Sequence, residues 1–221
     1  MFSVIFEVQP HAESWDAYMA IAGSLRPELE RMDGFIDNIR YRSLTRPGWL
    51  LSLSCWRDEK ALVRWRTQAR HHAAQAQGRD AIFQDYHLRV GQVVADTQPP
   101  PGHTLREQRL DETEVGDAPA ITLVDAPADT SSAGADTADS IARRLGWAPD
   151  AYGLVGWDVF DAVLTPGAAI LMLAWHDRAA ADAFRTAARL PSRGRLRQIR
   201  VVRDYGLRDR REAPQYFADP R

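Results

Sequence analysis

Cysteine and lysine are nearly absent from this chain of 221 residues. Cys55 is the single cysteine, which excludes an intrachain disulfide and a cysteine-rich zinc site. Lys60 is the single lysine, whereas arginine and alanine are abundant, a bias typical of GC-rich bacterial genomes. Four histidines show no metal-ligand spacing, so we expect no metal site among them: His11, His87, His103 and His176.

A surplus of charge and long apolar runs are also lacking. The formal net charge is −2, from 28 basic and 30 acidic side chains, so we expect no nucleic-acid partner. No apolar run approaches the roughly 20 residues of a membrane helix, so we expect no membrane partner. The first ten residues, MFSVIFEVQP, have neither the basic start nor the apolar core of a signal peptide, which favours a cytoplasmic location.

The first 96 residues alternate between strand and helix patterns. β-branched and aromatic residues predict a strand at 2–8, and a helix with apolar residues every three or four positions begins near Ser14. Asp58 is a candidate N-cap for a second helix, 59–79, within which no proline breaks the pattern. The expected order is βαββαβ, an α+β, ferredoxin-like unit whose other strands lie at 35–44, 49–56 and 86–94.

A polar segment with three consecutive prolines, 97–118, is predicted to be a linker to a second pattern of the same kind. A shift of 119 positions matches the two patterns without a gap from Gly34 to Arg70. The match predicts a tandem duplication: a first domain at 1–96, a degenerate second domain at 119–205, and a polar, unanchored tail at 206–221.

One segment of the first copy is missing from the second. After Arg189 the match returns only at a shift of 108, so the second copy is about 11 residues shorter there. The missing residues correspond to HHAAQAQGR, 71–79, which contains no aliphatic side chain larger than alanine. A segment that only supported the fold would have been retained in both copies. We therefore expect a functional pocket in the first copy alone.

Four stretches of the first copy carry a family resemblance: VIFEV at 4–8, GFI at 34–36, LLSLSCWRDEKAL at 50–62 and WRTQARHHAAQAQGR at 65–79. Together they resemble the antibiotic biosynthesis monooxygenase (ABM) family over residues 1–95, and more weakly over the second copy. The tail RDYGLRDRREAP, 203–214, is similar to the end of single-domain members. The resemblance implies two ferredoxin-like units whose separate sheets face each other, as in a dimeric α/β barrel, with a pocket between sheet and helices. Further association to a homodimer stays open.

The resemblance leaves three functions open, because the family contains different chemistries. The first is a monooxygenase that acts with molecular oxygen on a small aromatic, phenol- or quinone-like substrate and needs no cofactor. The second is a haem-binding or haem-degrading monooxygenase. Val8 argues against haem breakdown, because relatives of that branch have asparagine after the glutamate of the first strand. The third is a non-catalytic module that binds a small molecule.

Trp65 and His71 match the family's pocket tryptophan and histidine, and His71 is the haem ligand in the second reading. On an unbroken helix, however, His72 shares the face of Trp65, and His71 lies about 120° away. The family pattern favours His71 as catalytic residue and helical geometry favours His72, so both stay candidates. A neutral imidazole would accept a phenol proton, and activity would then rise with pH through about 6.5.

Three further residues are candidates for substrate binding. Arg79 has the charge to bind an anion or a phenolate, with a plain helix-end role as the alternative. Tyr41 and Phe83 are candidates for an aromatic pocket wall. Trp65 has a packing role as its alternative, because Phe184 replaces it in the second copy.

Overall fold

The computed structural model describes residues 1–127 and 137–214. The first half contains β1 (Phe2–Pro10), η1 (Ala12–Ser14), α1 (Trp15–Leu29), β2 (Phe35–Ser43), β3 (Leu50–Trp56), α2 (Glu59–Thr67), α3 (Ala69–Gln77), η2 (Gly78–Ile82) and β4 (Phe83–Asp96). The second half contains β5 (Ala120–Ala126), α4 (Ala138–Arg144), β6 (Leu154–Ala162), β7 (Ala169–Trp175), α5 (Arg178–Ala187) and β8 (Arg195–Gly206). Among these described residues, no helix has the length and apolar character needed to cross a membrane.

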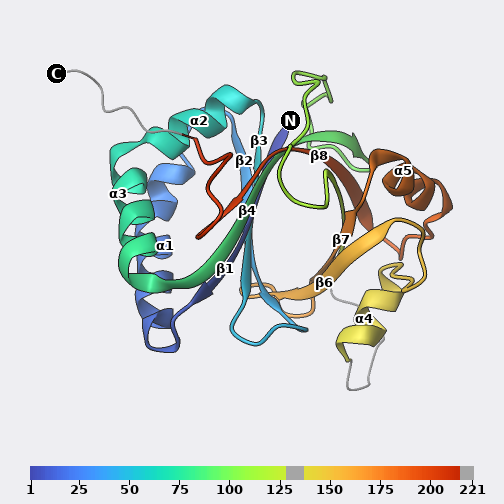
Figure 1. Cartoon of the computed structure of the whole chain (residues 1–221), viewed down its shortest axis with the longest axis horizontal. Coiled ribbons are helices and arrows are strands. Elements are labelled where there is room, and N and C mark those ends of the chain that lie inside the picture. The colour runs from blue at the N-terminus through green and yellow to red at the C-terminus, as the bar shows by residue number, and fades with distance from the viewer. Residues whose placement is uncertain (128–136, 215–221) are drawn as a thin grey trace.

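The strands form one closed antiparallel barrel in the order β1-β3-β2-β6-β7-β5-β8-β4. Helices α1, α2 and α3 cover its outer face on one side, and α4 and α5 lie on the other (Figure 1). The expected α+β class and the expected barrel-type arrangement are confirmed. The expectation that two separate sheets face each other is wrong, because β4 pairs with β8 and β2 pairs with β6. Edge-to-edge closure satisfies the backbone groups that two open sheets would leave exposed.

Equivalent junctions in the two halves have the same local geometry. Asp58 and Asp177 each accept a hydrogen bond of 2.8 Å from the backbone N–H three residues later, and so cap α2 and α5. Gly34 and Gly153 have φ of +85° and +75°, and a Cβ at either would lie 2.6 Å or less from an alanine Cβ of the following helix. Only glycine meets both requirements at these turns.

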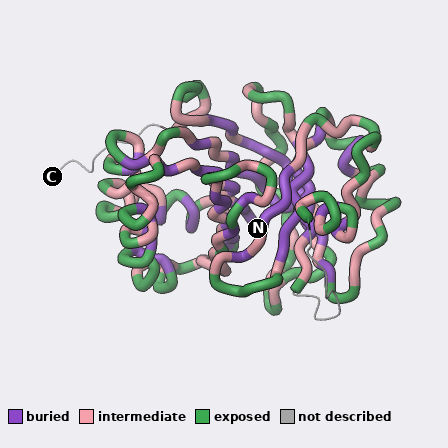
Figure 2. The backbone as a smooth tube through the Cα atoms, turned by 90° about the horizontal axis from the view of Figure 1, so that it is seen from below, coloured by how far each residue is buried: buried purple, intermediate pink, exposed green. Residues whose placement is uncertain are grey.

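The barrel interior is a packed core, as the buried strands in Figure 2 show. All eight strands contribute to one apolar cluster, which contains Met1, Ile5, Tyr41, Leu51, Leu53, Val93, Ile121, Leu123, Phe160, Ala162, Ile170, Met172, Ile199 and Val201. Beside this cluster, Arg46 pairs with Glu7 at 2.5 Å and with Asp158 at 2.6 Å. Glu7 belongs to β1 and Asp158 to β6, so this arginine joins the two halves through two buried carboxylates.

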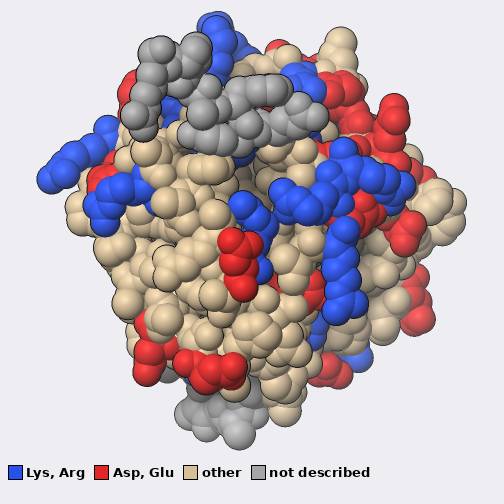
Figure 3. Space-filling view, turned by 60° about the vertical axis from the view of Figure 1, so that its left-hand side comes forward, with Lys and Arg blue, Asp and Glu red and all other residues tan. Residues whose placement is uncertain are grey.

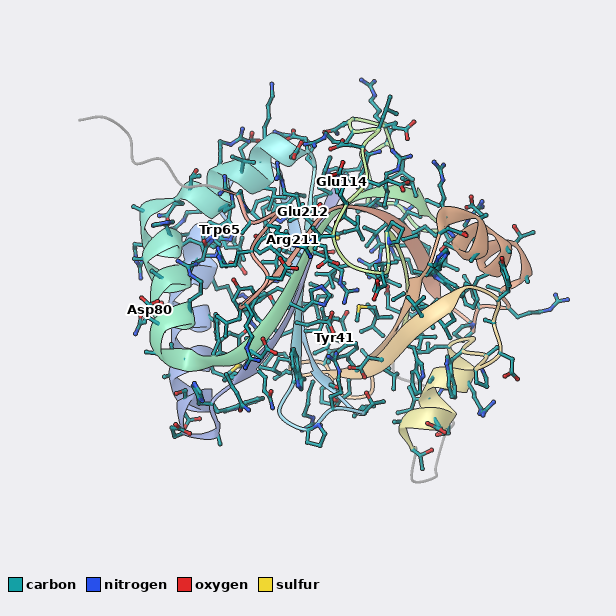
Figure 4. All side chains as sticks on the ribbon, viewed as in Figure 1. Tyr41, Trp65, Asp80, Glu114, Arg211 and Glu212 are labelled. Atoms are coloured by element: carbon teal, nitrogen blue, oxygen red, sulfur yellow. The ribbon has the colours of Figure 1, made fainter. Side chains whose placement is uncertain are left out.

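The segment after β8 is held against the barrel. Glu212 accepts hydrogen bonds from the backbone N–H groups of Asp204, at 2.6 Å, and Glu114, at 2.8 Å. Figure 4 shows Glu212 and Glu114 next to each other. Arg210 donates a hydrogen bond to the Tyr86 hydroxyl. The expectation of an unanchored tail is therefore wrong for 207–214, and its remainder, 215–221, lies outside the described residues.

Candidate active site

A cavity of about 430 Å³ lies between the helices and the outer face of the barrel in the first half. Apolar side chains of α1, including Leu25 and Leu29, form one wall, and β1 and β4 contribute Phe6 and Val90. The second half also reaches this cavity, through Arg203 and Tyr205 of β8 and through Arg210 and Pro214. The volume and the largely apolar lining suit a small organic molecule.

The helix predicted at 59–79 is broken at Gln68, so the expectation of an unbroken helix is wrong. Gln68 has an extended backbone, with ψ of 131°, between α2 and α3. Its side chain accepts a hydrogen bond from the His71 N–H at 2.8 Å and thereby caps α3. The same amide donates to Glu28 of α1 at 2.7 Å. A capping side chain and a contact with another helix thus end α2 without proline or glycine.

The break lets the His71 ring stack on Trp65. The two ring centroids are 4.2 Å apart, and their planes differ by 16°. His71 Nδ1 lies 2.9 Å from the Trp65 carbonyl oxygen. A carbonyl only accepts hydrogen bonds, so Nδ1 carries the proton and Nε2 presents a lone pair. The Gln75 amide nitrogen lies 3.2 Å from Nδ1 and 3.4 Å from Nε2, so the tautomer is decided by the shorter contact with the carbonyl. The imidazole is therefore fixed in one tautomer.

Burial lowers the pKa of His71 to about 4, and the positive charge of a protonated His72 would act in the same direction. The hydrogen bond to the Trp65 carbonyl opposes this shift but does not outweigh the loss of hydration. The neutral form consequently dominates far below pH 6.5. The pH dependence expected for an unperturbed imidazole is thus corrected downward, because the cavity wall removes water from the ring.

Most of the candidate site residues lie on one cavity. His72, Arg79 and Phe83 line it together with Trp65 and His71. Phe83 packs in a group of aromatic rings, with centroid distances of 5.7 to 6.1 Å, that contains Phe6, Tyr18 and Tyr86. This group forms an aromatic wall at the end of the cavity where α3 has passed into β4.

Tyr41 does not line this cavity. Its side chain is 3% exposed and belongs to the barrel core, on the opposite side of β2 from the helices. Figure 4 accordingly places Tyr41 within the barrel and Trp65 on the helical side. Alternation along β2 explains the difference, since Asn38 and Arg40 line the cavity while Tyr41 faces the interior. A molecule in the cavity cannot contact Tyr41.

Sequence reasoning missed Arg40 of β2, Tyr18 of α1 and Tyr205 of β8, all of which line the cavity. Strand alternation in 35–44 was a signal for Arg40, because it places this residue on the face opposite Tyr41. The segment RDYGLRDRREAP resembles a family terminus, and that was the signal for Tyr205. Neither signal by itself identifies the cavity that these residues share.

Steric crowding explains why position 78, in the motif that ends at Arg79, is a glycine. It begins η2, a single π-helical turn between α3 and β4. A Cβ at Gly78 would lie 2.4 Å from the Phe83 ring, so a larger residue would displace the aromatic wall of the cavity. Insertions of this kind often occur at functional sites.

The equivalent space between helix and sheet in the second half is packed with side chains. Trp147 and Trp157 have ring centroids 4.1 Å apart, and Phe184 lies against Trp175 at 5.2 Å. Leu190 packs on the same cluster. The second half therefore uses its helical layer as core, whereas the first half encloses the cavity.

The donor groups present were compared with what metals and haem require. No group of three or more His, Cys, Asp or Glu side chains suitable for a metal ion occurs in 1–127 or 137–214. A histidine that holds haem iron is neutral and generally donates a hydrogen bond from its second nitrogen, and His71 has both properties. The donor chemistry of His71 therefore fits a residue that would hold haem iron.

Comparison with known proteins identifies the class to which this fold and cavity belong. The family described as "Antibiotic biosynthesis monooxygenase" matches residues 1–77. A protein of Pyricularia oryzae (strain 70-15) named "Jasmonate monooxygenase ABM" is 48% identical over 223 residues, which cover 98% of each chain. This chain belongs to the ABM monooxygenase family, and the resemblance inferred from its motifs is confirmed.

Solved structures also match this chain, at low sequence identity and low TM-score. One described as an antibiotic biosynthesis monooxygenase has 16% identity and a TM-score of 0.39, and covers 43% of this chain and 100% of its own. A putative monooxygenase from Lactobacillus acidophilus NCFM has 9% identity and a TM-score of 0.39, over 92% of this chain and 94% of its own.

Proposed function

We propose that this chain is a monooxygenase that oxidises a small, largely apolar molecule in the cavity, with molecular oxygen and without a cofactor. The observation that carries the proposal is the state of His71. Its ring is neutral, its Nδ1–H donates a hydrogen bond to the Trp65 carbonyl, and its Nε2 carries an unprotonated lone pair. The residue lines the cavity. Membership of the ABM family supports an oxygenase reaction.

In this proposal, His71 Nε2 accepts a proton from the substrate. The resulting anion transfers electrons to oxygen, and the apolar walls with Trp65 keep water from the intermediate. A pKa of about 4 keeps Nε2 unprotonated at neutral pH but makes it a weak base. The substrate anion therefore has to be strongly delocalised. For an activated CH₂ group, the products are a carbonyl and water, so all four electrons of O₂ reduction come from the substrate.

Two substrate classes are proposed for testing. Jasmonate is the first, because it is the substrate in the name of the relative with 48% identity. A small phenol-like aromatic is the second, supported by the aromatic wall of Phe6, Tyr18, Phe83 and Tyr86. Simple insertion of oxygen into a C–H bond consumes two electrons that the substrate does not provide. Assays therefore need arms with and without a reductant such as reduced nicotinamide.

The test is product mass spectrometry after incubation with ¹⁸O₂, together with oxygen uptake. One ¹⁸O atom is expected in the product of dialysed, chelator-treated protein. His71→Ala is expected to lower kcat about 10²–10⁴-fold, and His72→Ala much less. The reverse order of the two variants would assign the proton transfer to His72. Full activity in both variants would contradict a mechanism in which either histidine accepts the proton.

A haem-dependent reaction is the second candidate, favoured by the donor state of His71. Bound haem would supply oxygen activation, and His71 would hold it through Nε2. Titration with haem would then produce a Soret band that His71→Ala abolishes. Absence of a band together with labelled product supports the cofactor-free route. Ligand binding without product from either assay leaves a non-catalytic binding module.

We further propose that the two halves are ferredoxin-like units that arose by tandem duplication, with a functional cavity in the first. The shared caps and glycine turns support this origin. Cytoplasmic location and a possible homodimer stay predictions. The bacterial origin inferred from composition also stays a prediction. The relative with 48% identity comes from a fungus.

A further inference from the structure

Arg40 brings a positive charge to the cavity, and it forms no ion pair with an acidic side chain of residues 1–127 or 137–214. It is a half-buried residue of β2 that lines the cavity. Its guanidinium lies near the hydroxyl of Tyr18, which is 7% exposed, and acts to lower the pKa of that hydroxyl against the larger effect of burial. Its Nε is buried, and no hydrogen-bond partner for it occurs among the described residues. Because this atom is shielded, Arg40 would meet a ligand through its terminal guanidinium nitrogens.

The charges around Arg40 favour an anion. Besides Arg66, which already has an interaction, four arginines line the cavity: Arg40, Arg79, Arg203 and Arg210. The one carboxylate among its described lining residues is Glu59, which pairs with Arg109 at 2.8 Å. This excess is local, because Arg, Asp and Glu side chains are mixed on the helical face seen in Figure 3, where most of the surface is uncharged. The positive potential is therefore directed at a ligand within the cavity.

Arg40 and His71 lie at different ends of the cavity. Tyr18, which lies near Arg40, packs on Phe83 with ring centroids 6.1 Å apart, and Gly78 contacts the same Phe83 ring. His71 precedes Gly78 by seven residues along α3, a rise of about 10 Å. The side chains between the two ends are largely apolar. Arg40 thus places a cationic group at the end of the cavity that is remote from His71.

We propose that Arg40 and the Tyr18 hydroxyl bind the carboxylate of an amphiphilic monocarboxylic acid, whose apolar body extends toward His71. The guanidinium offers two parallel N–H donors to a carboxylate, and the Tyr18 hydroxyl adds a third donor. This inference rests on the proposed function only in using the same cavity. It assigns the substrate class that the cavity selects, organic acids over their neutral esters, and the residue that selects it.

The test is calorimetric binding at pH 7 of two acid and ester pairs: jasmonate with methyl jasmonate, and octanoate with methyl octanoate. The wild-type protein is expected to bind each acid about 10–100-fold more tightly than its ester. Arg40→Gln is expected to abolish this preference. Arg42→Gln is the matched control, because Arg42 is an exposed residue of the same strand that pairs with Asp161. Arg42→Gln is expected to retain the full preference, and Arg79→Gln tests the other candidate anion-binding arginine of the cavity.

Equal binding of acid and ester by the wild-type protein, or no binding of any acid, would overturn the proposal. A preference lost in Arg79→Gln but kept in Arg40→Gln would overturn the assignment to Arg40. If Arg40→Gln does not fold, Tyr18→Phe provides the test. An unchanged preference for the acid in a folded Tyr18→Phe protein would contradict the proposed site. Absence of ¹⁸O-labelled product with the acid preference intact would overturn the monooxygenase proposal alone.

Discussion

His71 illustrates how the surroundings of one residue determine its chemistry. An imidazole in water is half protonated near pH 6.5, but the cavity wall lowers the pKa of His71 to about 4. The Trp65 carbonyl determines which nitrogen carries the proton, and the Trp65 ring orients the imidazole. Adjacent His72 lines the same cavity. The sequence predicted that His72 shares a helical face with Trp65, but that prediction assumed an unbroken helix, and α2 ends before His72.

Stability is expected to depend on the protonation of His71. Above pH 6.5 the ring is neutral in the folded and unfolded states, so burial imposes no titration cost. Between pH 6.5 and 4 the unfolded chain binds a proton that the folded state excludes, so stability falls as pH falls. The loss is at most about 3 kcal/mol and is complete below pH 4. Urea unfolding at pH 7 and 4.5 measures it, and His71→Gln should lose less; an equal loss would contradict the burial of the ring.

At the scale of the element, α3 distinguishes the first half from the second. α2 and α5 both end at a residue with extended backbone, Gln68 and Ala188, with ψ of 131° and 133°. In the first half the chain then begins α3, and in the second it continues to β8. Gln68 therefore serves two functions, since it ends α2 and caps the helix that carries His71.

Gln68→Ala is expected to lower both stability and activity. Loss of the α3 cap and of the bond to Glu28 costs about 1 kcal/mol or somewhat more, and the His71 ring loses its fixed position. Asp177→Ala is the matched control, because it removes the cap of α5 far from the cavity. It should cost about 1 kcal/mol and leave kcat unchanged. Denaturant unfolding and steady-state kinetics measure the two effects. Unchanged kcat in Gln68→Ala would show that the cap does not position His71.

At the scale of the whole molecule, the barrel makes the cavity a shared structure. Its walls come mainly from the first half, but Arg203 and Tyr205 of β8 complete it because β8 pairs with β4. Arg210 extends the same wall by its hydrogen bond to Tyr86. The asymmetry of the two halves therefore applies to their helical layers, while the strands of both halves contribute to the barrel.

Substitutions in the second half should consequently separate into two groups. Phe184→Ala removes a ring that packs on Trp175, so we expect a loss of about 2–4 kcal/mol in unfolding free energy with kcat unchanged. Arg210→Met removes a cavity contact, so we expect KM to rise while stability changes by less than about 1 kcal/mol. Kinetics and chemical denaturation distinguish the two. A folded Phe184→Ala protein without turnover would contradict the structural role of that layer.

Local sequence determined the strands, helix caps and turns of this protein. Alternating β-branched and aromatic residues predicted the strands, Asp58 and Asp177 cap their helices, and glycine occupies the turn at Gly34 where φ is positive. These features depend on neighbours within a few residues, so the sequence by itself contains them. The motif from Trp65 to Arg79 likewise led to the family by its sequence alone. In the structure, residues of this motif line one cavity wall.

Contacts between distant segments decided the rest. The break at Gln68 depends on Glu28 of another helix, and the barrel closes because β2 and β4 pair with strands more than 100 residues away. Tyr41 and Arg40 lie on opposite sides of β2, and only the side of Arg40 is covered by helices that enclose a cavity. Such contacts are formed when the chain folds on itself and buries its apolar faces, and no local pattern specifies which remote segment supplies the partner.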